Sequence, residues 1–269
     1  MNPFLRLLSE NRGRVARDKA FRVVRASAGA QEAHVYVYDV IVDSDIEAEW
    51  FGGVSKQAFT QAIAAIDAPQ IRLHIDSPGG SVFAARTMAS ALRDHAARVV
   101  CQIDGLAASA ASVLAMAADE VLMAEGTMMM IHKAWMLAAG NADDLLATAA
   151  LLEKVDGTIA DTYAQRTGMD AAAVLDLMAA ETWMTAEEAI AAKFADGLTQ
   201  PAAADPAARA AWNLSAFAHA PACACAAAPA HPAAPAAAAA QPNPDDARIV
   251  RARQSQRTRV AELAYLQPV

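Results

Sequence analysis

Prolines divide the chain into two parts that cannot fold in the same way. Of the 12 prolines in 269 residues, nine lie at or beyond Pro201, and between residues 4 and 200 only Pro69 and Pro78 occur. Proline fixes φ and lacks an N–H donor, so frequent prolines exclude both helix interiors and central strands. Regular structure is therefore expected before residue 200, with a composition break near that position.

The part after the break has low complexity. Residues 200–246 are mostly alanine and proline, with too few bulky side chains for a core. We expect a disordered Ala/Pro-rich C-terminal extension here, serving as a linker. Residues 247–269 are expected to be a basic C-terminal segment that could form a short helix.

Charge is distributed just as unevenly. Residues 1–25 carry a net charge of +5 and residues 246–269 one of +3; since the whole chain carries −8, the part between them carries −16. An acidic body argues against specific nucleic-acid binding by the folded domain. The basic arm over residues 1–29 and the basic C-terminal segment could contact an acidic partner or simply be solvated tails.

Composition limits the remaining classes. Hydrophobic residues make up 55% of the chain, enough for one sizeable core. No uncharged apolar run of about 18 residues and no secretory signal is evident, so we expect a cytoplasmic protein that does not cross a membrane. A C-x-C at Cys223 and Cys225, with His219 and His231 nearby, could clip a metal, but neither a metal site nor a cofactor is expected.

Between residues 30 and 199 strand and helix patterns alternate, which predicts an α/β domain with βαβ units. The strands are expected at 34–42, 70–76, 97–104, 119–124 and 127–135, and the helices at 52–67, 82–96, 105–118, 141–166, 170–181 and 185–197. Ser55 is the expected N-cap of the first helix, and Thr185 with Glu188 forms a capping box at the last.

Two turns in this pattern could carry chemistry. In SPGG (77–80), Gly79 and Gly80 precede a helix, where backbone N–H groups can stabilise a negative charge. In GLAAS (105–109), Ser109 is a candidate nucleophile, and His132 at the end of MMMIH is a candidate base. Taken singly, a tight turn without chemistry and a capping or packing serine are the favoured explanations, and a core histidine is at least as good an explanation of His132.

The order of the motifs is more specific. SPGG, GLAAS, MIH and ETWMTAEEAIAAKFAD (181–196) follow one another as in the ClpP family of serine peptidases, which residues 34–199 resemble. The resemblance is nearest to the ClpP-like head maturation proteases of bacteriophages, because of the YVYDVIV strand (36–42), the GGVS segment (52–55) and the ETW variant of the acidic motif. It covers neither the N-terminal arm nor the chain beyond residue 200.

The resemblance implies a catalytic triad and an oxyanion hole. It makes Ser109 the nucleophile and His132 the general base. The family's aspartate, two residues before an aromatic, corresponds to Glu181, which is one methylene longer; Asp176 is the alternative. The oxyanion hole would comprise the N–H groups of Gly80 and Ala110, with Gly79 shaping the turn.

The resemblance also implies the architecture and the assembly. We expect the ClpP/crotonase-type fold of repeated β-β-α units, with a protease domain over residues 30–199. The chain would form a homo-oligomeric ring, and the helix at 141–166 would project as a handle between rings, or else pack on its own domain. Ser112, on the same helix as Ser109, is interpreted as a packing residue.

The expected function is that of a serine endopeptidase, acting without ATP as a lone chain. Its substrates would be scaffold or major capsid proteins, cleaved inside the assembling prohead in the bacterial cytoplasm. Three alternatives stay open: a general ClpP-type degradative peptidase, a crotonase-fold acyl-CoA enzyme, and a non-catalytic assembly module with a ClpP-like core. The acyl-CoA enzyme would need no Ser–His pair.

Overall fold

The computed structural model describes residues 3–15, 20–24, 31–199 and 212–221. The chain divides into two units, residues 1–227 and 228–269, and all described residues belong to the first. Most of the predicted linker, all of the predicted basic C-terminal segment, and the Cys223, Cys225 and His231 of the possible metal clip lie outside the described residues.

One branched sheet organises the described part of the chain. Its main path runs β1-β2-β5-β6-β7-β10, parallel except for the antiparallel pair β1–β2. The strands are β1 (Phe21–Val24), β2 (Glu32–Val37), β5 (Gln70–Ser77), β6 (Arg98–Ala108), β7 (Glu120–Met123) and β10 (Gly197–Leu198). The expected α/β class is therefore confirmed.

The sheet branches at β6 because this long strand changes partner along its length. Residues Val100–Ile103 pair with β7, whereas Leu106–Ala108 pair with β8 (Met128–Ile131). On its other edge β8 pairs antiparallel with β9 (Thr182–Thr185). The expected helix over 105–118 begins too early, since pairing with β8 keeps residues 105–108 extended and α6 spans only Ala110–Ala115.

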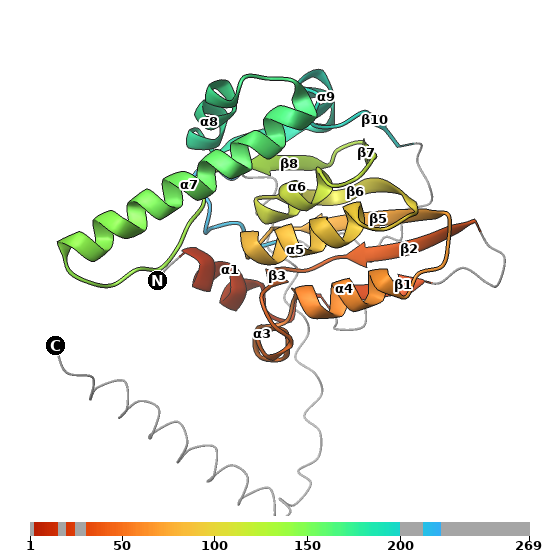
Figure 1. Cartoon of the computed structure of the whole chain (residues 1–269), viewed down its shortest axis with the longest axis horizontal. Coiled ribbons are helices and arrows are strands. Elements are labelled where there is room, and N and C mark those ends of the chain that lie inside the picture. Colours follow the sequence, from red (N-terminus) through yellow and green to blue (C-terminus); the bar gives the residue numbers. More distant parts are fainter. Residues whose placement is uncertain (1–2, 16–19, 25–30, 200–211, 222–269) are drawn as a thin grey trace, which may run out of the picture. The chain divides into compact units, whose positions relative to one another are not determined.

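Three helices cover one face of the sheet side by side (Figure 1), namely α4 (Lys56–Ala64), α5 (Val82–Arg93) and α6. The long α7 (Ala142–Thr167) packs on α8 (Ala171–Ala179), which is followed by β9 and α9 (Ala186–Ala191). The remaining described elements are α1 (Pro3–Asn11), β3 (Ile41–Val42), α3 (Asp45–Phe51) and β4 (Val54–Ser55).

The predicted helix caps form. The Ser55 side chain accepts a hydrogen bond from the Ala58 N–H at the start of α4. At α9, Thr185 and Glu188 bond reciprocally to each other's backbone N–H groups, which completes a capping box. Satisfying these otherwise unpaired donors determines where both helices begin.

The main core lies between the sheet and the helices, and a second, smaller core is separate from it. It joins Leu7 and Leu8 of α1 to Trp212, Leu214 and Phe217, together with side chains of β6 and β8. Residues 212–221 fall inside the predicted linker, so the composition of that region concealed a packed segment. The two chain regions outside the expected protease domain thus meet on its surface.

None of the helices in the described ranges is both long and apolar enough to cross a membrane.

Because β5 lies in the middle of the sheet, truncating its buried side chains should lower the free energy of unfolding. Leu73 is completely buried in this strand, so Leu73→Ala should lower the free energy of unfolding by about 2–5 kcal/mol through lost packing and a cavity. Ile46 on α3 is 66% exposed, and Ile46→Ala should change it by less than about 0.5 kcal/mol. Urea denaturation followed by circular dichroism measures both; equal losses would contradict this core assignment.

Candidate active site

Ser109 lies at the junction between β6 and α6 in a strained backbone conformation. Its φ and ψ are 55° and −124°, a positive φ that residues other than glycine rarely adopt. The N–H of Ser109 donates to Met130 O over 2.9 Å, which ties this turn to β8. The hydroxyl is partly exposed and is therefore presented at the surface of a cavity.

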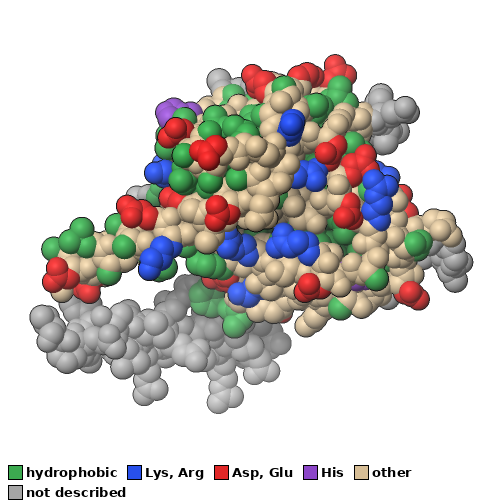
Figure 2. Space-filling model, turned by 45° about the horizontal axis from the view of Figure 1, so that its top comes forward, with side chains coloured by type: hydrophobic (Ala, Val, Ile, Leu, Met, Phe, Trp, Pro, Cys, Tyr) green, Lys and Arg blue, Asp and Glu red, His purple; other side chains and the backbone are tan. Residues whose placement is uncertain are grey.

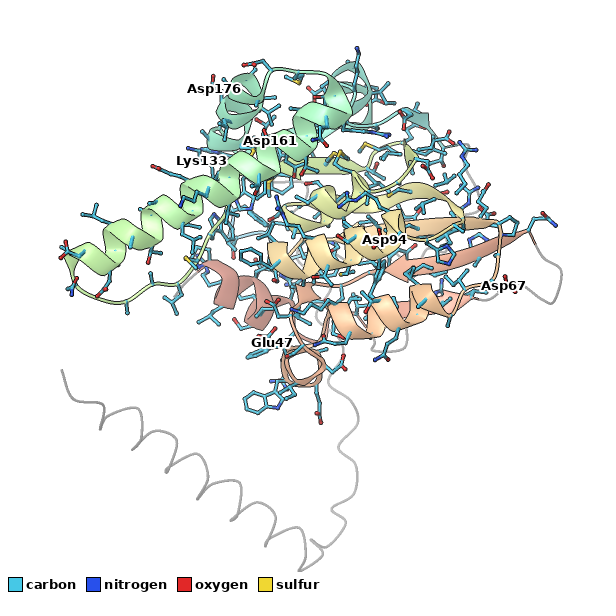
Figure 3. The ribbon with its side chains drawn as sticks, in the orientation of Figure 1. Glu47, Asp67, Asp94, Lys133, Asp161 and Asp176 are labelled. Atoms are coloured by element: carbon cyan, nitrogen blue, oxygen red, sulfur yellow. The ribbon has the colours of Figure 1, made fainter. Side chains whose placement is uncertain are left out.

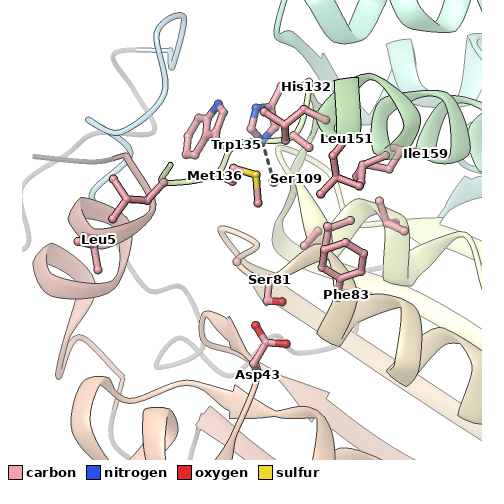
Figure 4. Close-up of a pocket in the computed structure, with 18 of the residues that line it drawn as sticks. Leu5, Asp43, Ser81, Phe83, Ser109, His132, Trp135, Met136, Leu151 and Ile159 are labelled. Carbon is pink, nitrogen blue, oxygen red and sulfur yellow. Dashed lines mark hydrogen bonds between the residues drawn. The ribbon is translucent and has the colours of Figure 1, made fainter. Parts of the chain in front are cut away.

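Strand pairing brings His132 to Ser109. Ala108 on β6 is paired with Met130 on β8, so the residues that directly follow the two strands lie side by side. The Nε2 atom of His132 is 2.7 Å from Ser109 Oγ (Figure 4), within hydrogen-bond distance. The two residues that motif order singled out are thus brought together across 23 positions of sequence.

The His132 ring is enclosed by aromatic side chains. It is only 9% exposed, with Trp135 and Phe217 in edge contact at centroid distances of 4.5 and 5.5 Å. Burial lowers the pKa of His132 to about 4, and the negative charge of Glu181 acts in the opposite direction. The imidazole is therefore neutral at physiological pH, the state in which it can accept a proton from a serine hydroxyl.

Glu181 follows α8 in a left-handed conformation with φ of 50°. Its carboxylate accepts hydrogen bonds from three N–H groups: Ala218 N at 2.9 Å, His219 N at 2.6 Å and Trp183 Nε1 at 3.2 Å. Among the described residues these are its hydrogen-bond donors, and His132 Nδ1 is not one of them. At this position Glu181 acts on the imidazole through its charge.

Asp176, the alternative carboxylate, lies on the exposed face of α8 (Figure 3). The negative charge of Glu181, by contrast, raises the pKa of His132. Glu181 therefore stays the candidate for the third position of the triad.

The SPGG turn packs directly against the serine. Gly79 has φ of 93°, and its N–H donates to Ser77 Oγ over 3.1 Å, so this glycine shapes the turn. Within the described part of the chain, the N–H groups of Gly80 and Ala110 have no such acceptor. These two groups are the candidate donors to a developing oxyanion.

Ser112 is a structural residue, as expected. It is fully buried, and its hydroxyl contacts Ser109 O at 2.6 Å, Met130 O at 3.1 Å and Tyr163 Oη at 2.8 Å. These contacts join α6 to β8 and α7 and leave no room for a substrate.

The Ser109 hydroxyl opens onto an apolar cavity bounded by α5, α6, the segment after His132, and α7 (Figure 4). Its walls are formed mainly by apolar side chains, including Phe83, Val113, Trp135, Met136, Leu152 and Ile159. Such a lining favours an uncharged, apolar substrate group beside the nucleophile.

Sequence reasoning missed the contribution of residues 212–221. Bulky residues within this Ala/Pro-rich stretch, namely Trp212, Leu214 and Phe217, could have indicated a packed segment. His219, considered there as part of a metal clip, instead places its Nδ1 3.1 Å from Ala180 O. No cluster of three side chains suited to a metal ion occurs among the residues that the structure describes.

Comparison with known proteins points to one family. Residues 33–202 match the sequence profile of the family described as Clp protease. The chain is 31% identical over 120 residues to the ATP-dependent Clp protease proteolytic subunit 1 of Protochlamydia amoebophila, covering 43% of this chain and 58% of that protein. It is 31% identical over 123 residues to the ATP-dependent Clp protease proteolytic subunit of Deinococcus radiodurans, covering 45% and 60%.

A third relative, the ATP-dependent Clp protease proteolytic subunit 1 of Chlamydia abortus, is 32% identical over 128 residues, covering 46% of this chain and 67% of that protein. The alignments thus span less than two thirds of the first two relatives. Neither α1 nor residues 212–221 lies within the range matched by the family profile.

Gly79 provides a test of the turn beside Ser109. A Cβ atom at this position would lie 2.6 Å from Ala108 O and 2.8 Å from Ser109 Cβ, so Gly79→Ala must displace the nucleophile or the turn. We expect the rate of Ser109 labelling by a fluorophosphonate probe to fall by about 10²–10³-fold.

Gly126→Ala is the matched control for that substitution. Gly126 has a comparable φ of 78°, but a Cβ there meets no atom within 4 Å. Gly126→Ala should introduce similar backbone strain without lowering the rate of Ser109 labelling. An equal loss of labelling in both variants would mean that backbone strain, and not the contact with Ser109, is responsible.

Burial of His132 predicts the pH dependence of labelling. The imidazole must be neutral to act as a base, and its pKa is lowered from 6.5 to about 4. The labelling rate should therefore hold from neutral pH into the acid range and fall to half near pH 4. A midpoint at 6.5 or above would contradict the buried environment.

The same shift affects stability, so folding must be monitored at each pH. In the unfolded chain His132 is protonated with its ordinary pKa of 6.5, whereas in the folded chain it is protonated only near pH 4. Stability contributed by neutral His132 is therefore complete above pH 6.5 and is lost as the pH falls towards 4. Circular dichroism at each pH separates loss of fold from protonation of the base.

Proposed function

Because the chain belongs to the Clp protease family, we propose that it is a serine endopeptidase with Ser109 as nucleophile, His132 as general base and Glu181 as the orienting carboxylate. The observation that carries this proposal is the 2.7 Å contact between Ser109 Oγ and His132 Nε2 at a strained strand-to-helix turn. The catalytic domain is proposed to extend over residues 30–199.

The chemistry follows from these positions. As Ser109 Oγ attacks a peptide carbonyl, its proton passes to His132 Nε2 and then to the leaving amine, giving an acyl-enzyme. Water, deprotonated by His132, then hydrolyses the ester and restores the serine. Glu181 stabilises the imidazolium that forms in each step, which offsets the unfavourable effect of burial.

The tetrahedral intermediate requires donors for its oxyanion. The N–H groups of Gly80 and Ala110 flank Ser109 and are proposed to supply them, each worth about 10²–10³-fold in rate. The apolar cavity beside Ser109 suits an apolar side chain next to the scissile bond. A peptide chain, whose backbone can bond to exposed strand or loop edges, is the substrate class that uses both features.

Assembly into a homo-oligomeric ring is part of the proposal. Leu145, Leu146 and Leu151 on α7 are 47%, 69% and 48% exposed, a concentration of apolar surface that a second copy could cover. In Figure 2 this end of α7 extends from the body of the molecule with hydrophobic side chains at its tip.

As the biological role, we propose cleavage of scaffold or major capsid proteins in the assembling phage head, within the bacterial cytoplasm and without ATP. The support is the sequence resemblance in YVYDVIV (36–42), GGVS (52–55) and the Glu181-Thr182-Trp183 variant of the acidic motif.

General protein degradation is the second candidate. The relatives are named as proteolytic subunits of ATP-dependent Clp proteases, which favours a peptidase that works with an unfoldase. The two roles differ in substrate and in the need for ATP, but they share the same site. A purely structural module would not require the Ser109–His132 contact.

The active site is tested by labelling with a fluorophosphonate. Wild type should be labelled and Ser109→Ala should not, because the probe forms its bond with the activated hydroxyl. Ser90→Ala, an exposed serine on α5, is the control and should be labelled like wild type. Absence of labelling in the wild type would overturn the peptidase assignment.

The biological role is tested by co-expression. Wild type and Ser109→Ala are each produced with the scaffold and capsid proteins encoded beside the gene, and separately with an ATP-dependent unfoldase and an unfolded substrate. Cleavage of the capsid or scaffold protein by wild type alone supports the maturation role. ATP-dependent loss of the unfolded substrate, with the capsid proteins intact, supports general degradation instead.

A further inference from the structure

Residues 212–221 form an ordered segment against the active site, although they lie outside the range that the family profile matches. Trp212, Leu214 and Phe217 are 3%, 1% and 5% exposed. They pack with Leu7 and Leu8 of α1 and with side chains of β6 and β8. Burial of three large side chains anchors the segment through the hydrophobic effect.

Polar contacts determine the register of the segment. The indole N–H of Trp212 donates to Asp76 Oδ1 over 2.9 Å, and the same oxygen accepts the Leu106 N–H of β6 at 3.0 Å. The Asn11 side chain donates to Asn213 O at 3.0 Å and accepts from Asn213 N at 2.7 Å. The segment is therefore joined to α1 and, through Asp76 of β5, to the β6 strand that precedes Ser109.

Phe217 reaches the catalytic histidine. Its ring meets His132 edge-on at 5.5 Å, lies 5.0 Å from Trp135, and approaches Trp183 at 5.9 Å. These contacts restrict rotation of the imidazole and exclude water from one side of it.

The next two residues hold the carboxylate. Ala218 N–H donates to one oxygen of Glu181 and His219 N–H to the other, over 2.9 and 2.6 Å. A carboxylate has about four lone-pair sites, and with Trp183 Nε1 three are taken. These three donors leave one lone-pair site, on Oε2.

Such fixation matters more for a glutamate than for an aspartate. Its extra methylene adds a rotatable bond, so an unrestrained carboxylate would occupy several positions relative to the imidazole. Two backbone N–H groups approaching both oxygens restrict it to one. This arrangement explains how a longer acidic side chain can serve where the family has aspartate.

We propose that residues 212–219 are a positioning segment of the active site, which fixes the Glu181 carboxylate through the backbone of Ala218 and His219 and the His132 ring through Phe217. The proposal rests on the proposed serine peptidase function. Phe217 is a positioning residue, since it acts on the imidazole and touches no reacting atom.

The kinetic test uses the full chain and a fluorogenic peptide. In Phe217→Leu, kcat should fall by about 10–100-fold while KM changes by less than about twofold, because ground-state binding of the peptide is untouched. Phe59→Leu is the matched control: Phe59 is equally buried, on α4 against Phe21 at 6.0 Å, and its loss should leave kcat unchanged.

A double-variant cycle tests whether Phe217 and Glu181 act together. If both orient the imidazole, Phe217→Leu should lower kcat by less than about twofold in a Glu181→Gln background. Independent, multiplying losses would overturn the proposal. So would a rise in kcat in Phe217→Leu, which would identify the segment as a strap that inhibits the enzyme.

Amide hydrogen exchange tests the contact without relying on activity. The N–H groups of Ala218 and His219 should be protected in wild type and in Ser109→Ala, and should lose that protection in Glu181→Ala. Unprotected amides in the wild type would overturn the positioning segment. Protected amides in a wild type that neither hydrolyses peptide nor reacts with fluorophosphonate would instead overturn the peptidase function.

Discussion

The pairing of β6 with β8 is the interaction on which the rest of the site depends. Past Ile103, β6 leaves β7 and takes β8 as its neighbour, and the register that sets Ala108 opposite Met130 places Ser109 next to His132. The Ser109 N–H bond to Met130 O continues the same register into the turn. Gly79 then packs on residues 108–110, so the proposed oxyanion donors depend on this pairing too.

Burial and a neighbouring negative charge have opposite effects on the pKa of His132. Removing His132 from water keeps its imidazole neutral, but it also disfavours the imidazolium that would form in the proposed reaction. The carboxylate of Glu181 acts against that penalty, and its effect is greater in a water-excluded environment. Because aromatic rings exclude water around His132, the position of the Glu181 carboxylate has a larger effect on the charge state of the imidazole. That carboxylate accepts hydrogen bonds from residues 218 and 219, which lie outside the range matched by the family profile.

Much of the site follows from local motifs, while the missed parts depend on distant partners. Ser109, His132 and the two glycines were singled out by the order of the motifs that contain them, and the caps at Ser55 and Thr185 form as predicted. The helix expected from residue 105 is wrong, because its alanine-rich residues are equally suited to a strand once β8 is beside them. Residues 212–221 were hidden by the alanine and proline that surround them.

The sequence by itself determined the α/β class and the residue types that serine chemistry requires, since periodicity, caps and glycine turns are local properties. Only the tertiary structure showed that the charge of Glu181 acts on the buried imidazole of His132, and that Trp212, Leu214 and Phe217 pack into a second core. The physical reason is that burial and charge at His132 arise from groups as distant in sequence as Phe217, whose approach depends on strand register and packing and not on any local pattern.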